Sequence, residues 1–264
     1  MAKSPASTPV TNTCKGPVKA WSYSTHMNFV KCKRILYFDK VQRAKKPELV
    51  PPPGKEEHPL TRGNRVHEAA ELYVRGSVEL IPELHHFAVP LTALRDFFVD
   101  IEEEKSPLRM EMEEDWAFDQ EWNPCGWFSD AAWIRMKVDC LLINSDSGEA
   151  IIIDYKTGRK HGNEVKHAIQ AQLYQLATFL RYPELDTVTV EFWYTDHKEI
   201  TSSTFKRSFG MAFKKLFTSF GKAITNEIEF RASPAPYSCK YCDWGRHNGS
   251  GICTNDYYLG AKVS

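Results

Sequence analysis

The sequence predicts an α/β fold in which a central mixed β-sheet is flanked by helices. Helical and strand patterns follow one another in the order helix, strands, helix, strand, strand, helix, which is typical of this class. The 264 residues are 42% hydrophobic and 26% charged, close to the usual values for a folded domain, so disordered and fibrous classes are excluded. No apolar run reaches about 18 residues, and the N-terminal residues lack the apolar stretch of a signal peptide. We therefore expect a cytoplasmic protein without a membrane span.

The N-terminal part is expected to contain a flexible arm followed by helices. Residues 1–20 are rich in Ser, Thr, Pro and Lys and predict the arm, which precedes a single domain over residues 21–264. Aromatic and basic residues favour a helix over 22–42, and prolines predict a loop over 45–59. The next helix is expected to start at Thr61 as its N-cap, because apolar positions then recur on one helical face.

The rest of the chain alternates between helix and strand patterns. β-Branched residues over 111–154 predict strands, two of which form a hairpin around the turn signal at 145–148. Apolar residues at helical spacing or in alternation predict the other elements. These are helices over 88–104, 164–181 and 207–224, and strands over 186–195 and 200–205.

The 34 Lys and Arg residues balance the 34 Asp and Glu residues, but bases and acids are separated along the chain. Residues 1–46 hold ten bases and Asp39 as the single acid, whereas residues 96–122 hold eleven acids against Lys105 and Arg109. The basic segment suits an anionic polymer, although charge runs are more often solvated surface than binding sites. We expect the acidic segment to face away from such a polymer.

Two acids lie at the ends of apolar strands in the predicted hairpin. With a four-residue turn at 145–148, Asp139 pairs with Asp154, and directly opposed side chains are about 4.5–5.5 Å apart. Two buried carboxylates at this separation share a proton, raise a pKa or bind a cation. Strand side chains alternate, so Lys156 points to the same face as Asp154. This arrangement suits metal-dependent phosphodiester hydrolysis; the alternative is a solvent-facing Asp139 and a salt bridge at Asp154.

Six segments stand in a fixed order along the chain: WSYSTHMNFVKCKRILYF, RGNRVHEAAELY, KVDCLL, IIDYKTG, QAQLY, and a C-x-x-C followed by a later cysteine. Together they resemble the RecB-like branch of the PD-(D/E)XK nuclease superfamily, which includes the AddB nuclease domain and the CRISPR-associated adaptation exonucleases. The resemblance spans roughly residues 21–253. It implies a restriction-endonuclease-like core.

The resemblance also implies a metal site and a catalytic set. His67, Asp139 and Asp154 would ligate Mg or Mn, with the backbone carbonyl of Tyr155 as a further ligand. Asp139 and Asp154 would act in catalysis with Lys156, the catalytic lysine. For His67 taken alone, the alternative is a buried structural histidine.

Other residues are expected near this site. By the same resemblance, Gln170 and Tyr174 would lie along the nucleic-acid path, and they are one helical turn apart. Glu71, one turn after His67, could reach the cleft or form a surface salt bridge. Glu113, which precedes the hairpin, is a weaker candidate.

Seven cysteines in a chain without an export signal are better interpreted as thiols or metal ligands than as disulfides. The resemblance implies that Cys32 joins Cys239, Cys242 and Cys253 to hold a 4Fe-4S cluster, which would clip the N- and C-terminal segments together. A zinc site that includes His247 is the competing interpretation, and unligated thiols are a third.

These observations predict a metal-dependent DNA nuclease, expected to be an exonuclease of recombination, repair or phage DNA processing that works with a helicase or recombination protein. The alternative is a catalytically silent DNA-binding or scaffold subunit with a structural iron–sulfur or zinc site. Six basic side chains are expected to contact the DNA backbone without reading sequence: Arg62, Arg65, Arg159, Lys160, Lys214 and Lys215.

Overall fold

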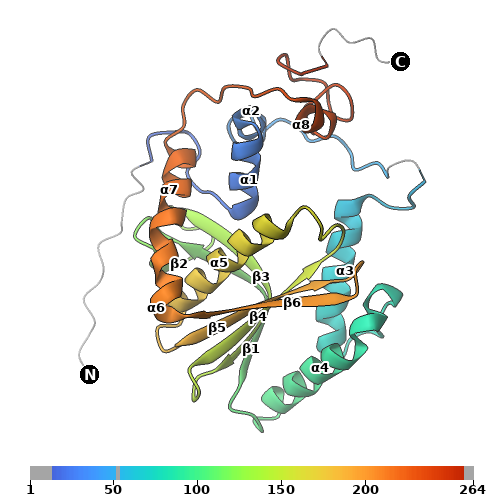
Figure 1. Ribbon diagram of the computed structural model, residues 1–264, viewed down its shortest axis with the longest axis vertical. Coiled ribbons are helices and arrows are strands. Elements are labelled where there is room, and N and C mark those ends of the chain that lie inside the picture. Colours follow the sequence, from blue (N-terminus) through green and yellow to red (C-terminus); the bar gives the residue numbers. More distant parts are fainter. Residues whose placement is uncertain (1–13, 52–53, 259–264) are drawn as a thin grey trace. The chain divides into compact units, whose positions relative to one another are not determined.

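The computed structural model describes residues 14–51 and 54–258 (Figure 1). In this part of the chain no helix is long and apolar enough to cross a membrane. The chain forms two compact units, each containing part of the stretch expected as one domain. Unit 1 consists of Met1–Glu48, Ala117–Met136 and Leu216–Ser264, and unit 2 of Leu49–Trp116 and Lys137–Lys215.

A six-stranded sheet has the order β2-β1-β3-β4-β5-β6. The pairs β1–β2, β3–β4 and β5–β6 are antiparallel and β4–β5 is parallel, so the predicted mixed sheet is confirmed. The strands are β1 (Arg109–Phe118), β2 (Pro124–Cys125), β3 (Ile134–Asn144), β4 (Glu149–Lys156), β5 (Thr187–Tyr194) and β6 (Glu199–Lys206).

Helices and short turns precede, interrupt and follow the strands (Figure 1). The N-terminal elements are α1 (Tyr23–Lys31), α2 (Lys33–Leu36), the π-helical turn η1 (Tyr37–Val41), α3 (Pro59–Val74), the 3-10 turn η2 (Pro82–Phe87) and α4 (Ala88–Glu102). The later elements are α5 (Glu164–Arg181), α6 (Arg207–Gly210), η3 (Met211–Phe213), α7 (Lys214–Thr225) and α8 (Pro236–Lys240).

Two predicted helices differ from the observed ones for local reasons. The helix expected over 22–42 is broken at Cys32, whose backbone is extended at φ −168°. The helix expected to start at Thr61 begins at Pro59 instead, because the His58 ring nitrogen accepts a hydrogen bond from Leu60 N at 3.1 Å and acts as the cap. Proline at the first helical position needs no amide partner.

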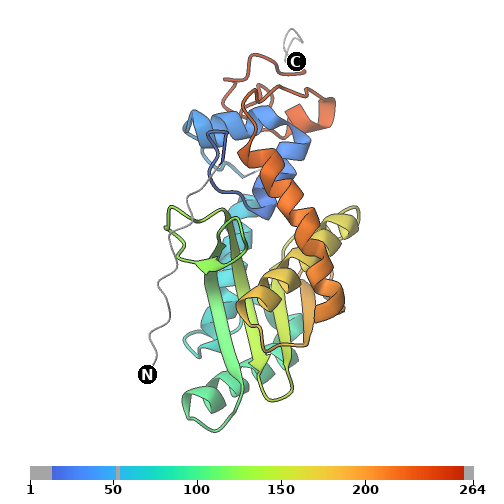
Figure 2. The ribbon, with the colours of Figure 1, turned by 90° about the vertical axis from the view of Figure 1, so that its left-hand side faces the viewer.

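In unit 2, helices lie on both faces of the sheet (Figures 1 and 2). Val66, Ala70 and Val74 recur at one-turn spacing on α3 and are almost fully buried. They belong to an apolar cluster with α4 and with the β4 residues Ile153 and Tyr155. Because strand side chains alternate, Asp154 and Lys156 point to the opposite face, which carries α5.

In unit 1, tryptophans and small residues form the core. Trp21 and Trp133 meet edge to face with ring centroids 5.8 Å apart. A Cβ added to Gly221 would lie 2.3 Å from Trp133, so only glycine fits there. Of the expected flexible arm, residues 1–13 lie outside the described residues. In the remainder, Val18 is 3% exposed, and Gly16 N donates to Thr225 O at 2.8 Å.

Candidate active site

The β3–β4 hairpin has the predicted register. The first strand ends at Asn144 and the second begins at Glu149, and the ladder of paired residues runs from there to Cys140 and Ile153. Continued by one position, this register would place Asp139 opposite Asp154. Asp139 Oδ2 instead accepts a hydrogen bond from Tyr155 N at 2.9 Å, so this carboxylate takes the donor that the next ladder position would use.

His67 reaches the same carboxylate from α3. Its Nδ1 lies 3.1 Å from Asp139 Oδ2, and its ring meets the Tyr155 ring edge to face with centroids 5.8 Å apart. Burial disfavours the imidazolium, but the hydrogen bond and charge of Asp139 outweigh it, so the pKa of His67 is raised. The ring orientation of the histidine is therefore set by an acid on strand β3.

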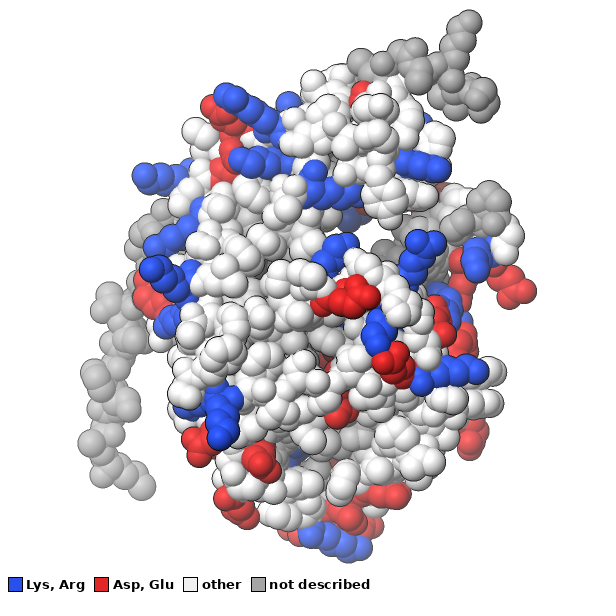
Figure 3. Space-filling model, viewed as in Figure 1, with Lys and Arg blue, Asp and Glu red and all other residues white. Residues whose placement is uncertain are grey.

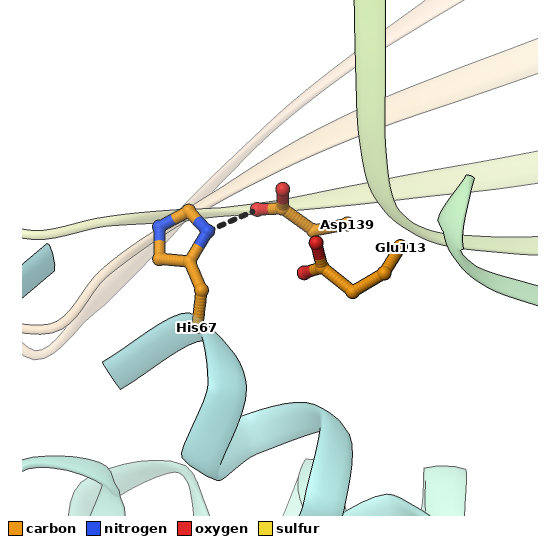
Figure 4. Close-up of side chains that lie close together, drawn as sticks. All are labelled: His67, Glu113 and Asp139. Carbon is orange, nitrogen blue, oxygen red and sulfur yellow. Dashed lines mark ion pairs between the residues drawn. The ribbon is translucent and has the colours of Figure 1, made fainter. Parts of the chain in front are cut away.

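Glu113 completes a cluster of three possible metal ligands. One ligand atom each of His67, Glu113 and Asp139 lie within 4.8 Å of one another (Figure 4). Burial and then the charge of Asp139 raise the pKa of Glu113, as expected for a half-buried carboxylate beside another acid. This residue belongs to the acidic 96–122 segment, so one acid of that segment lies at the candidate site. That the segment faces away from nucleic acid stays a prediction.

The backbone at Glu113 has an unusual conformation. Its φ is +53° inside β1, a left-handed conformation that costs a residue other than glycine roughly 1–3 kcal/mol. Such residues persist where surrounding structure holds them, and they cluster at functional sites. Sequence patterns carry no signal for this feature, which explains why Glu113 ranked as a weak candidate.

Asp154 lies outside the three-residue cluster, on the α5 face of the sheet. It is 3% exposed; Oδ1 accepts a hydrogen bond from Tyr174 Oη at 2.8 Å, and Oδ2 forms an ion pair with Lys156. Burial raises the pKa of Asp154, and the Lys156 ammonium opposes that shift. The predicted proximity of Asp154 and Lys156 is thus observed, with Tyr174 as a third partner.

Gln170 and Tyr174 are adjacent on α5, one turn apart as their spacing predicts. Gln170 Nε2 donates to Tyr174 Oη at 2.9 Å, and Tyr174 is 7% exposed. The chain Gln170, Tyr174, Asp154 orients a site carboxylate from within the protein. Contact of either side chain with nucleic acid stays a prediction.

His167, one turn before Gln170 on the same helix, was missed in the sequence. Its Nδ1 lies 2.7 Å from Tyr194 Oη. Burial, followed by the charge of Lys156, lowers the pKa of His167 to about 4. The imidazole is therefore neutral at physiological pH and adds no positive charge beside Lys156.

Three of the six bases expected to contact DNA are paired with acids. Arg62 binds both carboxylate oxygens of Asp196, and Arg65 binds Glu57 and Glu83. Lys160 pairs with Glu199. Glu71 binds Arg75 at 2.8 Å, so the salt-bridge interpretation of Glu71 is confirmed. The other pairs could not be predicted from the sequence, because their acidic partners lie in other segments of the chain, up to 134 residues away.

The donor set fits a hard divalent cation. Mg and Mn prefer carboxylate oxygens, and Mn accepts an imidazole nitrogen. His67, Glu113 and Asp139 offer this combination within one cluster.

The four cysteines expected to act together line one cavity of unit 1. Cys32, Cys239, Cys242 and Cys253 surround it with Trp244. Backbone amides point at two of the sulfurs, with Ser233 N 3.3 Å from Cys32 Sγ and Tyr257 N 3.4 Å from Cys239 Sγ. Hydrogen bonds of this kind favour the charged thiolate form, which is the form of cysteine that binds a metal.

The iron–sulfur and the zinc interpretations of these cysteines both stay predictions. Among the described residues, no three cysteine sulfurs lie within 4.8 Å of one another. His247, the competing ligand, stacks on Tyr258 with centroids 5.3 Å apart and is not among the residues that line the cavity.

Comparison with known proteins identifies one family. The family model of the PD-(D/E)XK nuclease superfamily matches residues 20–246. No curated protein matches the chain significantly. A solved structure titled "Crystal structure of SSO0001" has a TM-score of 0.43 and 16% identity, covering 89% of this chain and 86% of that chain, a similarity too low to support an argument.

Proposed function

This chain belongs to the PD-(D/E)XK nuclease superfamily, a superfamily of metal-dependent nucleases, and we propose that it is a DNA exonuclease of recombination, repair or phage DNA processing. The observation that carries the proposal is the convergence of His67, Glu113 and Asp139 beside the Asp154–Lys156 pair. The Tyr155 amide links the two groups, because it donates to Asp139 from the position between Asp154 and Lys156.

His67, Asp139, Asp154 and the backbone carbonyl of Tyr155 would hold Mg or Mn. We add Glu113 to this set because its carboxylate lies close to the ligand atoms of His67 and Asp139. When bound, the ion would supply Lewis acidity at a phosphate oxygen and a lowered pKa for a water molecule. The charge of the cation would also offset the repulsion between Glu113 and Asp139.

The protein's own groups would position the reactants. Asp139 holds the His67 ring and the Tyr155 amide, and Tyr174 fixes the Asp154 carboxylate. The Lys156 ammonium, held beside Asp154, would orient a water molecule or offset developing charge on the phosphate. Neutral His167 adds no further positive charge beside this ammonium.

The decisive experiment compares linear, nicked and covalently closed DNA in Mg or Mn. We expect degradation of the linear form, with the closed circle untouched and the Lys156→Ala variant inactive. Lys206→Ala, which removes an exposed lysine at the end of β6, is the matched control and should retain full activity. Cleavage of the closed circle would contradict an exonuclease, and an inactive parent that still binds DNA would favour the silent scaffold.

We also propose that Cys32, Cys239, Cys242 and Cys253 bind a 4Fe-4S cluster, because all four line one cavity. Protein purified without air should be brown, absorb near 400 nm, and contain iron. Cys239→Ala should lose the colour, whereas Cys125→Ala, outside the cavity, should keep it. A colourless preparation containing zinc would contradict the cluster.

A further inference from the structure

The two units carry opposite net charge, although the whole chain is neutral. Unit 1 contains 16 Lys and Arg against 9 Asp and Glu, and unit 2 contains 18 against 25. Nucleic acids attract basic surfaces. The unit that holds the candidate active site is therefore the less suitable one for retaining a polyanion.

Ion pairs within unit 2 further reduce the attraction of its bases for nucleic acid. Besides Arg62, Arg65 and Lys160, the pairs Arg75–Glu71, Arg109–Glu184 and Lys137–Asp115 occupy its bases. A lysine or arginine that already binds a carboxylate gains less free energy from binding a phosphate, because the carboxylate must first be displaced. Ion pairs with its own acids thus already occupy many of the bases of unit 2.

Unit 1 presents a basic and aromatic surface on and after α8. Tyr237 is 75% exposed and Tyr241 55% exposed, with ring centroids 5.1 Å apart. Lys240 Nζ lies 5.6 Å from the Tyr241 ring centroid. In the described part of the chain, neither Lys240 nor Arg246 forms an ion pair with a carboxylate. Figure 3 shows mainly blue side chains over α1, α2 and α8.

Large exposed aromatics beside unpaired cations match the chemistry of a single nucleic-acid strand. Bases stack on aromatic rings irrespective of sequence, and ammonium and guanidinium groups follow the phosphates. Duplex DNA hides its base faces, so the exposed rings would add little to duplex binding. Building on the proposed nuclease function, we propose that unit 1 is the nucleic-acid-retaining unit and that Tyr237, Lys240 and Tyr241 bind single-stranded DNA.

The test measures binding by fluorescence anisotropy of a labelled single-stranded oligonucleotide in EDTA, which prevents cleavage. The Tyr237→Ala/Tyr241→Ala double variant should bind roughly 10-fold to 100-fold more weakly. Phe128→Ala, which removes another aromatic of unit 1 that is 90% exposed, should bind like the parent. Lys240→Ala should lower the slope of log affinity against log salt by about 0.7.

Further variants separate stacking from folding. Tyr237→Phe/Tyr241→Phe should retain binding, because the rings remain. Unchanged single-strand affinity in the alanine double variant, or an equal loss of single-strand and duplex affinity, would overturn the proposal. If the alanine variant does not fold, Lys240→Glu replaces it: weaker single-strand binding supports the proposal, and unchanged binding overturns it.

A small substrate distinguishes this inference from the proposed function. Hydrolysis of bis(p-nitrophenyl) phosphate in Mn requires the active site but not retention of a polymer. The double alanine variant should hydrolyse this ester like the parent while degrading single-stranded DNA more slowly. A parent that fails on the ester and on DNA contradicts the nuclease function, whereas the anisotropy results still decide the binding surface.

Discussion

Tyr174 donates its hydroxyl proton to Asp154 Oδ1 at 2.8 Å in the buried interior of unit 2. The bond joins α5 to the strand that carries the Asp154–Lys156 pair, so the orientation of this carboxylate depends on a helix. Gln170 supports the same hydroxyl from one turn away.

Tyr174→Phe should therefore lower kcat roughly 10-fold to 100-fold, since an unpaired buried carboxylate oxygen costs about 1–3 kcal/mol. DNA affinity in EDTA should not change. Tyr182→Phe, which removes a hydroxyl that donates to Glu111, is the control. Unchanged kcat with weakened DNA binding would instead favour a nucleic-acid contact for Tyr174.

Glu113→Gln should weaken Mn binding by at least about tenfold, because a charged ligand is replaced by a neutral amide. Calorimetric titration with Mn measures the affinity, and Glu114→Gln, at the neighbouring position, should leave it unchanged. Equal affinities of the parent and Glu113→Gln would exclude Glu113 from the metal site.

Glu113→Gly tests the strained backbone separately. Glycine adopts positive φ at little cost, so the metal-free variant should be more stable by about 1 kcal/mol, measured by urea unfolding. The same variant should have a higher free energy of unfolding and should lose Mn binding. A destabilised Glu113→Gly variant would show that the left-handed conformation carries no strain.

Asp196 should make stability depend on pH. Its hydrogen bond to Arg62 outweighs burial and lowers the pKa of Asp196, and Asp196 Oδ2 also accepts from Gly158 N at 3.0 Å. With a lowered folded pKa, the stabilisation is present above the unfolded pKa of about 3.9 and is lost as pH falls through the folded value. Urea unfolding of Asp196→Asn should thus differ from the parent at pH 7 and converge with it in acid.

The control for Asp196 is Glu199→Gln, which breaks the exposed pair with Lys160. Exposed pairs contribute little, so this variant should follow the parent at every pH. A pH-independent difference between Asp196→Asn and the parent would argue that packing, rather than charge, is what Asp196 contributes.

Gly221→Ala should destabilise the protein by about 1–3 kcal/mol, because the added methyl would overlap the Trp21 and Trp133 rings. Gly126→Ala introduces the same methyl where no atom lies within 4 Å and should be nearly neutral. Thermal unfolding of both variants measures the difference. Equal melting temperatures would show that the tryptophan pair shifts freely.

The sequence pattern predicted helix bounds and hairpin register correctly, because both depend on residues that are close together in the chain. The helix expected over 164–181 is α5 with the same bounds, since its apolar spacing and its packing face agree. The length of the four-residue turn determines which residues of β3 and β4 are paired. That register brings Asp139 to the end of the β3–β4 ladder.

Features that depend on distant partners were not predictable in the same way. The cap at His58 and the break at Cys32 come from contacts of side chains that have no strong capping or breaking preference. The pairing of Arg62 with Asp196 requires the tertiary fold, as does the left-handed backbone at Glu113. Composition alone suggested cations free to bind DNA, and it could not show which of them already bind acids.

The hydrogen bond from Tyr155 N to Asp139 Oδ2 makes one amide proton of the main chain a natural spectroscopic probe. Its resonance depends on the electron density of a carboxylate, so any cation that withdraws density from Asp139 should shift it. The neighbouring amides of β4, which donate to carbonyls of the ladder, provide an internal baseline. Occupancy of the site could therefore be followed by NMR of nitrogen-15-labelled protein, without a substrate or turnover.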